Sequence, residues 1–249
     1  HEKFLNVGTG GTLDGFGNYR FSNFVTGDRK WSFWQSERDG LARLYRYNNA
    51  DGSCEGAITP EGIIVQQLVA VDPEQQQIYF MANNLPEYSD PYYHGLCRVN
   101  FDGTGFSLLT PEDGEHMVRI FPDCLADTWS RVDQAPVTVL RDRDGGFLCE
   151  VLRADISALL EAGYIMPERF QVTATDGETP LYGILIRPAG MEEGKTYPFI
   201  DYIYGGMQIA NVPKAFTWKT TNGRESFGGL LEYAQLGNAG MILVGLGTP

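Results

Sequence analysis

Residues 44–61 read LYRYNNADGSCEGAITPE, and residues 96–112 read LCRVNFDGTGFSLLTPE. Each stretch opens with a strand-like run, passes through an Asp-Gly pair and ends in Thr-Pro-Glu. The two stretches begin 52 positions apart, at Leu44 and Leu96, and their threonines, Thr59 and Thr110, are 51 positions apart. A repeat of this length indicates that one structural unit occurs more than once along the chain.

The sequence around these stretches extends the repeat. The aromatic runs WSFW (31–34) and IYFM (78–81) lie at matching points before them, and TWSRV (128–132) and VTVLR (137–141) suggest a third unit. Asp-Gly between apolar runs is a strong hairpin signal, because both residues tolerate positive φ. In the first 155 residues such pairs begin at Asp14, Asp39, Asp51, Asp102, Asp113 and Asp144.

Units of about 45–50 residues with four short strands each are typical of β-propeller blades. We therefore expect residues 1–155 to form an incomplete β-propeller of about three blades. The alternative is an all-β sandwich whose hairpins resemble one another by chance.

A short helix is predicted next. Asp155 can cap its beginning, Gly163 can end it, and Pro167 prevents its continuation. Residues 156–168 are therefore interpreted as a linker helix between two domains.

The pattern changes after residue 168. Residues 170–175 and 181–186 predict a hairpin, 198–204 and 240–244 are apolar runs expected of buried strands, and 226–236 has helical spacing. Strand, helix and strand in this order imply a parallel sheet. The predicted fold class is thus β followed by α/β, with 169–249 as the start of the second domain. Both domains are expected to be incomplete, so we interpret the chain as a fragment.

Composition excludes several classes of partner. The net charge is −13 and no stripe of Lys and Arg is present, which argues against nucleic acid and anionic membranes. No apolar run approaches the roughly 18 residues of a membrane helix. A periplasmic, extracellular or cytoplasmic location is compatible with this sequence.

No metal or organic cofactor is expected. The four cysteines, Cys54, Cys97, Cys124 and Cys149, form no C-x-x-C pair and lie near no histidine cluster. We expect buried or half-buried free thiols, although an exported protein would allow a disulfide. A P-loop and a dinucleotide fingerprint are both absent.

Several stretches together carry a family resemblance. They are TDGETPLYG (175–183), YPFIDYIYGG (197–206), GLGTP (245–249), RAD (153–155) and SRVD (130–133). They resemble the dipeptidyl peptidase IV-like members of the prolyl oligopeptidase family of serine peptidases. The resemblance implies a β-propeller followed by an α/β-hydrolase domain, peptide substrates, release of N-terminal dipeptides and a homodimer. It also implies a Ser-His-Asp triad with serine in a G-x-S-x-G turn.

One catalytic element of that family falls within this chain. The resemblance places the oxyanion-hole tyrosine at Tyr204, where a phenol O–H can donate to the developing alkoxide. Gly205 and Gly206 would let the backbone approach the substrate closely. Spacing alone leaves open a strand-end tyrosine packed in the core. The family usually has proline where Met207 stands, and Asp-Gly-Arg-Gly where residues 244–247 read VGLG.

The triad itself is not found in these residues. No G-x-S-x-G occurs, and Ser226 is interpreted as a helix N-cap. Hydrolase triads run Ser, Asp, His along the chain, whereas His1, His94 and His116 all precede any such turn. We interpret His94 and His116 as turn or surface residues.

A polar loop at residues 85–94 contains two acidic residues, Glu87 and Asp90, which we expect to be solvated. The substrate-amine carboxylates of the family are expected upstream of these residues.

The sequence therefore predicts a serine-type exopeptidase for the full-length parent, with this chain inactive by itself. Two alternatives remain open, namely a propeller-based interaction module and a catalytically dead homologue.

Overall fold

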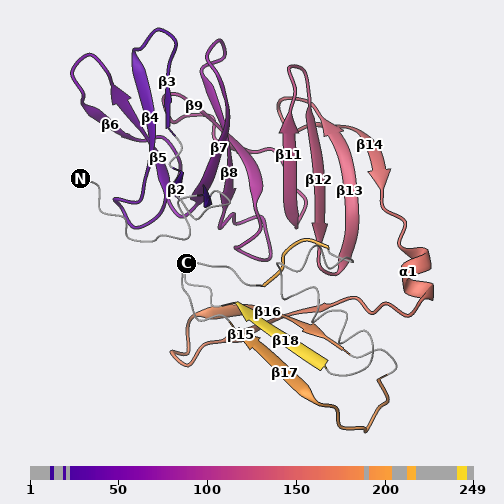
Figure 1. Cartoon of the computed structure of the whole chain (residues 1–249). Coiled ribbons are helices and arrows are strands. Elements are labelled where there is room, and N and C mark those ends of the chain that lie inside the picture. Colours follow the sequence, from indigo (N-terminus) through magenta and orange to yellow (C-terminus); the bar gives the residue numbers. More distant parts are fainter. Residues whose placement is uncertain are drawn as a thin grey trace. The chain divides into compact units, whose positions relative to one another are not determined.

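A computed structural model describes residues 12–13, 19–20, 23–187, 191–203, 212–216 and 240–245 (Figure 1). The chain divides into two compact units, one of residues 1–127 with 139–149 and one of 128–138 with 150–249. Strands dominate the described residues, and they form four four-stranded sheets. The short strands β1 (Thr12–Leu13) and β2 (Tyr19–Arg20) pair separately.

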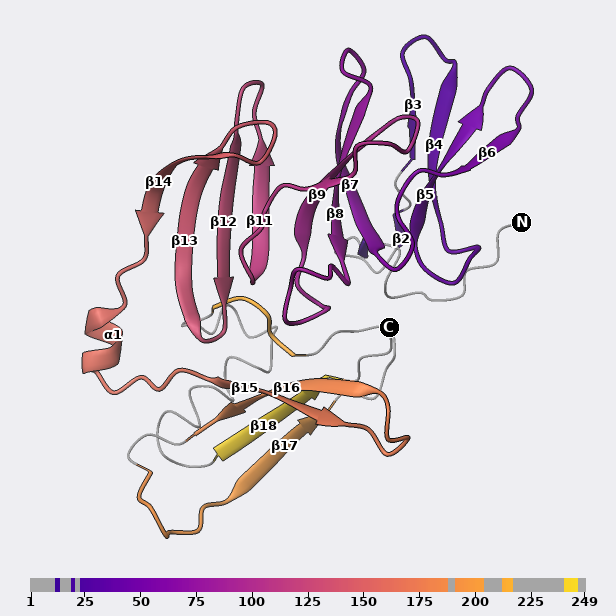
Figure 2. The same ribbon diagram turned by 180° about the vertical axis from the view of Figure 1, so that it is seen from behind.

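Three of the four-stranded sheets keep their strands in chain order, as seen from the opposite side in Figure 2. The first contains β3 (Asn23–Val25), β4 (Trp31–Ser36), β5 (Arg43–Asn48) and β6 (Cys54–Ala57). The second contains β7 (Ile64–Asp72), β8 (Gln77–Asn83), β9 (Gly95–Asn100) and β10 (Ser107–Leu108). The third contains β11 (Glu115–Ile120), β12 (Leu125–Arg131), β13 (Gln134–Arg141) and β14 (Phe147–Arg153).

The repeat has a common hydrogen-bond pattern. The hydroxyl oxygen of Thr59 accepts a bond from the backbone N–H of Leu44 at 3.2 Å. Thr110 does the same for Leu96 at 2.9 Å. Both threonines are buried, and a buried backbone donor must be paired. The recurring Thr-Pro-Glu therefore serves the same structural purpose at the end of the first and second sheets.

Asp-Gly turns connect consecutive sheets within the first unit. Gly103, with φ +84°, brings its backbone against Ile58, the residue that follows the last strand of the first sheet. Gly145, with φ +88°, packs more tightly, because a Cβ there would lie 2.8 Å from the carbonyl oxygen of Leu109. Only glycine combines this positive φ with such a close approach.

Two arginines reinforce the same contacts. Arg46 Nη1 donates to the carbonyl of Phe101 at 2.9 Å, and Arg98 Nη1 donates to the carbonyl of Arg143 at 3.2 Å. Arg46 and Arg98 are 52 positions apart, so the sequence repeat is also a repeat of polar contacts.

The main core lies between the first and second sheets. Phe33 of β4 is fully buried and its ring lies 4.7 Å from that of Phe101. Strand β8 is fully buried along Ile78, Tyr79 and Phe80, which explains its uninterrupted apolar sequence. Phe33, Ile78 and Phe80 pack the first and second sheets, which contain the sequence repeat, against each other.

One short helix lies within residues 156–168, which were predicted to be a linker helix. Helix α1 (Ser157–Glu161) begins after Ile156, which is its N-cap and has no side-chain capping bond, so Asp155 is not the predicted cap. The Oδ1 of Asp155 nevertheless accepts the backbone N–H of Ser157 at 2.9 Å. Gly163, with φ +92°, donates its N–H to Leu160 and ends the helix, as predicted. No described helix is long and apolar enough to cross a membrane.

The fourth sheet lies wholly in the second unit. It contains β15 (Glu168–Thr173), β16 (Pro180–Ile186), β17 (Phe199–Ile203) and β18 (Gly240–Gly245), in the order β15-β16-β18-β17. Strands β15 and β16 form the predicted hairpin, and β17 and β18 are parallel, also as predicted. The predicted helix at 226–236, with Ser226, lies outside the described residues.

Candidate functional site

The residues assigned to the oxyanion hole, Tyr204, Gly205 and Gly206, lie outside the described residues. Strand β17 ends at Ile203, one residue before Tyr204, and the chain is described again from Val212. The structure describes the strand before this segment and residues 212–216 after it.

The strand before Tyr204 is held by a continuous register across the sheet. Tyr202 of β17 pairs with Leu243 of β18, and Leu243 pairs with Ile184 of β16. Ile184, which is buried, pairs in turn with Arg169 of β15. One row of residues thus connects the outer strand of the sheet to the end of β17.

Arg169 is bound at the other end of this row by a carboxylate. Asp133, in the turn between β12 and β13, accepts a hydrogen bond from Arg169 Nε at 3.0 Å and one from Arg131 Nε at 2.9 Å. Burial by itself raises the pKa of Asp133, but the hydrogen bond from Arg131 and the charge of Arg169 outweigh it. The pKa of Asp133 therefore lies below its ordinary value.

The same hairpin also binds the segment after β17. Ser130 Oγ accepts the backbone N–H of Phe216 at 3.0 Å. The ring of Phe216 lies 6.2 Å from that of Tyr164, and Lys214 Nζ lies 5.9 Å from the ring centre of Tyr182 in β16. Residues 130–133 therefore contact both the outer strand of the sheet and the chain that follows Tyr204.

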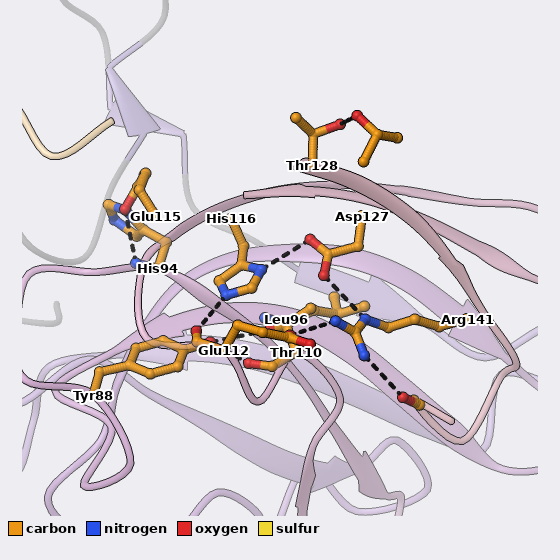
Figure 3. Close-up of polar contacts among 12 residues, drawn as sticks. Tyr88, His94, Leu96, Thr110, Glu112, Glu115, His116, Asp127, Thr128 and Arg141 are labelled. Carbon is orange, nitrogen blue, oxygen red and sulfur yellow. Dashed lines mark hydrogen bonds and ion pairs between the residues drawn. The ribbon is translucent and has the colours of Figure 1, made fainter. Parts of the chain in front are cut away.

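A buried charged network lies in the first unit, on strands of the third sheet (Figure 3). Asp127 is fully buried and accepts hydrogen bonds through both oxygens, from His116 Nδ1 at 2.8 Å and from Arg141 Nε at 3.0 Å. Arg141 also pairs with Glu112 through Nη2. Through Glu112, the network connects the Thr-Pro-Glu segment after the second sheet to β11, β12 and β13.

The expectation that His116 is a turn or surface residue is wrong. It lies in β11 with a side chain that is fully buried. Its Nε2 faces the carbonyl oxygen of Glu112 at 2.8 Å, and the ring of Tyr88 stacks on it at 5.7 Å. Both ring nitrogens of His116 are therefore engaged by acceptors, an arrangement that leaves neither available to activate a serine hydroxyl. The stacked ring of Tyr88 and the buried carboxylate of Asp127 account for its burial.

His94 has a more exposed carboxylate partner. Its Nδ1 lies 2.8 Å from Glu115 Oε1, and its backbone N–H donates to Glu115 Oε2 at 2.9 Å. This half-buried pair joins the end of the 85–94 loop to β11.

Of the two acidic residues predicted to be solvated in the 85–94 loop, Glu87 is exposed as predicted. Asp90 is buried, which corrects the prediction, and its Oδ1 accepts the backbone N–H of Tyr92 at 2.9 Å. Tyr88 and Tyr93 are buried in the same loop. The loop therefore folds inward around its aromatic residues.

All four cysteines are free, as predicted, but their burial differs from the expectation. Cys97 is buried, and that burial raises the pKa of its thiol. Cys124 is half-buried, whereas Cys54 and Cys149 are exposed. Among the residues that the structure describes, no group of three or more His, Cys, Asp or Glu side chains could hold a metal ion.

Sequence reasoning missed Asp127, Arg141 and Asp133. The sequence does contain a signal for Asp127 and Arg141, because each is a charged residue within a run that predicts a strand. These runs are LADTWSR for Asp127 and VLR for Arg141. Charges in such positions are almost never fully buried unless paired. Asp133 gives no comparable signal, since a turn aspartate is usually exposed.

Comparison with known proteins agrees with this architecture. Residues 18–136 match the model of the dipeptidyl peptidase IV (DPP IV) N-terminal region. Dipeptidyl peptidase 8 of Mus musculus and that of Homo sapiens are each 43% identical to the chain over 53 residues. That match covers 21% of this chain and 6% of either relative.

A crystal structure from Bacteroides ovatus ATCC 8483, assigned as a dipeptidyl aminopeptidase IV, has the same fold with a TM-score of 0.66. It is 23% identical, and the match covers 91% of this chain and 33% of the other. The chain therefore spans about a third of the solved protein and a much smaller part of the curated relatives it matches. Residues 18–136 are therefore similar to the dipeptidyl peptidase IV N-terminal region, and the chain shares its fold with part of the solved Bacteroides ovatus protein.

Proposed function

We propose that the protein containing this chain is a serine-type exopeptidase that releases dipeptides from the N-terminus of short peptides. The observation that carries the proposal is the match of residues 18–136 to the dipeptidyl peptidase IV N-terminal region. The shared fold over 91% of the chain supports it, because the likeness extends well beyond those residues.

The proposal assigns a role to each of three segments of the chain. Residues 1–155 would form blades of a β-propeller that surrounds the peptide, residues 156–168 a linker, and residues 169–249 the start of the α/β-hydrolase domain. The parallel pair β17 and β18, with its antiparallel neighbours, is compatible with the beginning of such a sheet.

In this assignment Tyr204 donates its phenol O–H to the oxyanion of the tetrahedral intermediate. Gly205 and Gly206 would allow close approach of the backbone to the peptide. The nucleophilic serine, the aspartate and the histidine are assigned to residues other than these 249, so the chain alone would not turn over substrate. The buried His116–Asp127 pair has no part in the chemistry, because both ring nitrogens are already engaged.

Tyr204→Phe in the full-length protein tests the assignment. A preorganised oxyanion donor is worth about 10²–10³ in kcat, so we expect a loss of that size with little change in KM. Hydrolysis of Gly-Pro and Ala-Pro p-nitroanilides measures both constants.

Tyr197→Phe is the matched control, because Tyr197 OH accepts a surface hydrogen bond from the backbone N–H of Glu192 at 2.8 Å. Equal kcat values for the two variants would remove Tyr204 from the oxyanion hole. A wild-type protein without turnover would contradict the peptidase function itself and favour an interaction module.

A further inference from the structure

We propose that Asp133 is a positioning residue that holds the sheet leading to Tyr204. Its carboxylate, at the tip of the β12–β13 hairpin, would keep strand β15 and, through it, the end of β17 in place. The catalytic consequence of this inference rests on the proposed function, but its structural consequence does not.

The first argument is the geometry of the carboxylate. Each oxygen of Asp133 accepts a hydrogen bond from a different arginine, Arg131 of β12 and Arg169 of β15. All three side chains are between 22% and 31% exposed, so water does not fully screen the pairs. Charge-assisted bonds of this kind are stronger than neutral ones.

The charge of Asp133 is required because it separates two cations. Without the carboxylate, Arg131 and Arg169 would bring like charges to the same turn, and like charges repel. An asparagine fills the same volume and keeps an acceptor, but it removes the negative charge that the two guanidinium groups share. The contact between the hairpin and β15 therefore depends on ionisation and not only on shape.

The second argument is the register of the sheet. Arg169 is the first member of the row that continues through Ile184 and Leu243 to Tyr202. Each step is a backbone pairing between neighbouring strands, which transmits a shift of β15 without requiring a side-chain contact. Tyr202 is two residues before Tyr204.

The third argument is that the same turn binds the chain on the other side of Tyr204. Ser130, three residues before Asp133, accepts the N–H of Phe216. The hairpin thus restrains β17, which ends before Tyr204, and residues 212–216, which follow it. Reactive groups are fixed by supporting residues of this kind, and here the support acts on described residues on both sides of Tyr204.

The test compares Asp133→Asn with Asp123→Asn in the full-length protein. Asp123 is an exposed aspartate in the turn between β11 and β12, so it gives the same chemical change in the same sheet. Hydrogen exchange of peptides covering residues 199–203 and 212–216 is the first readout. We expect faster exchange there in Asp133→Asn, no change in Asp123→Asn, and recovery in the conservative variant Asp133→Glu.

The second readout is kcat per active serine, with the active fraction titrated by a fluorophosphonate. A displacement of about 1 Å can cost 10²-fold in rate, so we expect Asp133→Asn to lower kcat roughly 10–100-fold at nearly constant KM. A merely structural residue would lower the titrated fraction and leave kcat per active serine unchanged. In the double variant with Arg169→Gln the effects should not add, because the two residues act through one contact.

The outcomes separate this inference from the proposed function. Exchange and kcat equal to those of Asp123→Asn would overturn the positioning role while the peptidase function stands. A wild-type protein without turnover or fluorophosphonate labelling would refute the peptidase function. The structural inference is then judged by hydrogen exchange alone. Unchanged exchange in Asp133→Asn would overturn the structural role of Asp133, and faster exchange would support that role.

Discussion

Replacing Asp127 with asparagine should destabilise the first unit more than any exposed charge substitution. Asp127 is fully buried between His116 and Arg141, and the side chain of Arg141 is only 2% exposed. Asparagine keeps the shape of the side chain but removes its charge. Among the described residues, the buried guanidinium would then keep one carboxylate partner, Glu112, whose side chain is 31% exposed.

The expected size follows from this burial. Removing one partner of a buried ion pair costs about 3–5 kcal/mol, because the other charge stays buried without compensation. Domains are stable by roughly 5–15 kcal/mol, so the loss would be a large fraction of the total. In a domain of 150–250 residues each kcal/mol lowers Tm by about 2–4 °C, which predicts a decrease of roughly 6–20 °C.

Urea and thermal unfolding, followed by circular dichroism, measure the effect. Asp144→Asn is the matched control, because Asp144 pairs with Arg98 but its side chain is 79% exposed, and exposed pairs contribute about 0–1 kcal/mol. Arg141→Met added to Asp127→Asn should restore much of the loss, since a buried pair replaced by apolar groups is often neutral. A loss no greater than that of Asp144→Asn would refute the reasoning.

Two further predictions concern glycines with positive φ and the pH dependence of stability. Gly145→Ala should destabilise the protein more than Gly52→Ala, because both have positive φ but only Gly145 would bring Cβ against Leu109; equal unfolding midpoints would contradict the close packing. Asp176 accepts hydrogen bonds from the hydroxyl and N–H of Thr179 and from the N–H of Glu178, which lower its pKa to about 2. A depressed carboxyl pKa stabilises the fold above the ordinary value of 3.8 and loses that contribution as pH falls towards 2. The stability difference between wild type and Asp176→Asn should therefore shrink between pH 4 and pH 2, and an NMR titration midpoint near 3.8 would argue against it.

Local patterns in the sequence predicted most of the strands. The runs at 44–48 and 96–100 fall within β5 and β9, and both Thr-Pro-Glu segments close a sheet in the same way. These features are encoded within short stretches by alternation, turn residues and a repeated threonine. They can be identified without knowledge of the tertiary structure.

The charged contacts could not be predicted in the same way. Asp127 and Arg141 meet because β12 and β13 are neighbours, and Asp133 meets Arg169 across 36 positions of sequence. Whether a turn aspartate is exposed or paired depends on which strand packs beside it, and sequence patterns do not contain that information. His116 was misjudged for the same reason, since its burial depends on Tyr88 and Asp127.

The catalytic assignment rests on family resemblance more than on geometry. Spacing alone left Tyr204 between a packed core residue and an oxyanion donor, and it lies outside the described residues. The structure adds the described chain before and after it, namely strand β17, whose register runs to Ile203, and the hairpin with Asp133.

Mass spectrometry of peptide products is the most direct test of the proposed exopeptidase function. The full-length protein is incubated with a peptide that has proline at its second position, and with the same peptide acetylated at its N-terminus. We predict release of the N-terminal dipeptide from the free peptide and no cleavage of the acetylated one, because a dipeptidyl peptidase acts at a free N-terminus. Internal cleavage of both peptides, or cleavage of neither, would contradict the proposed function.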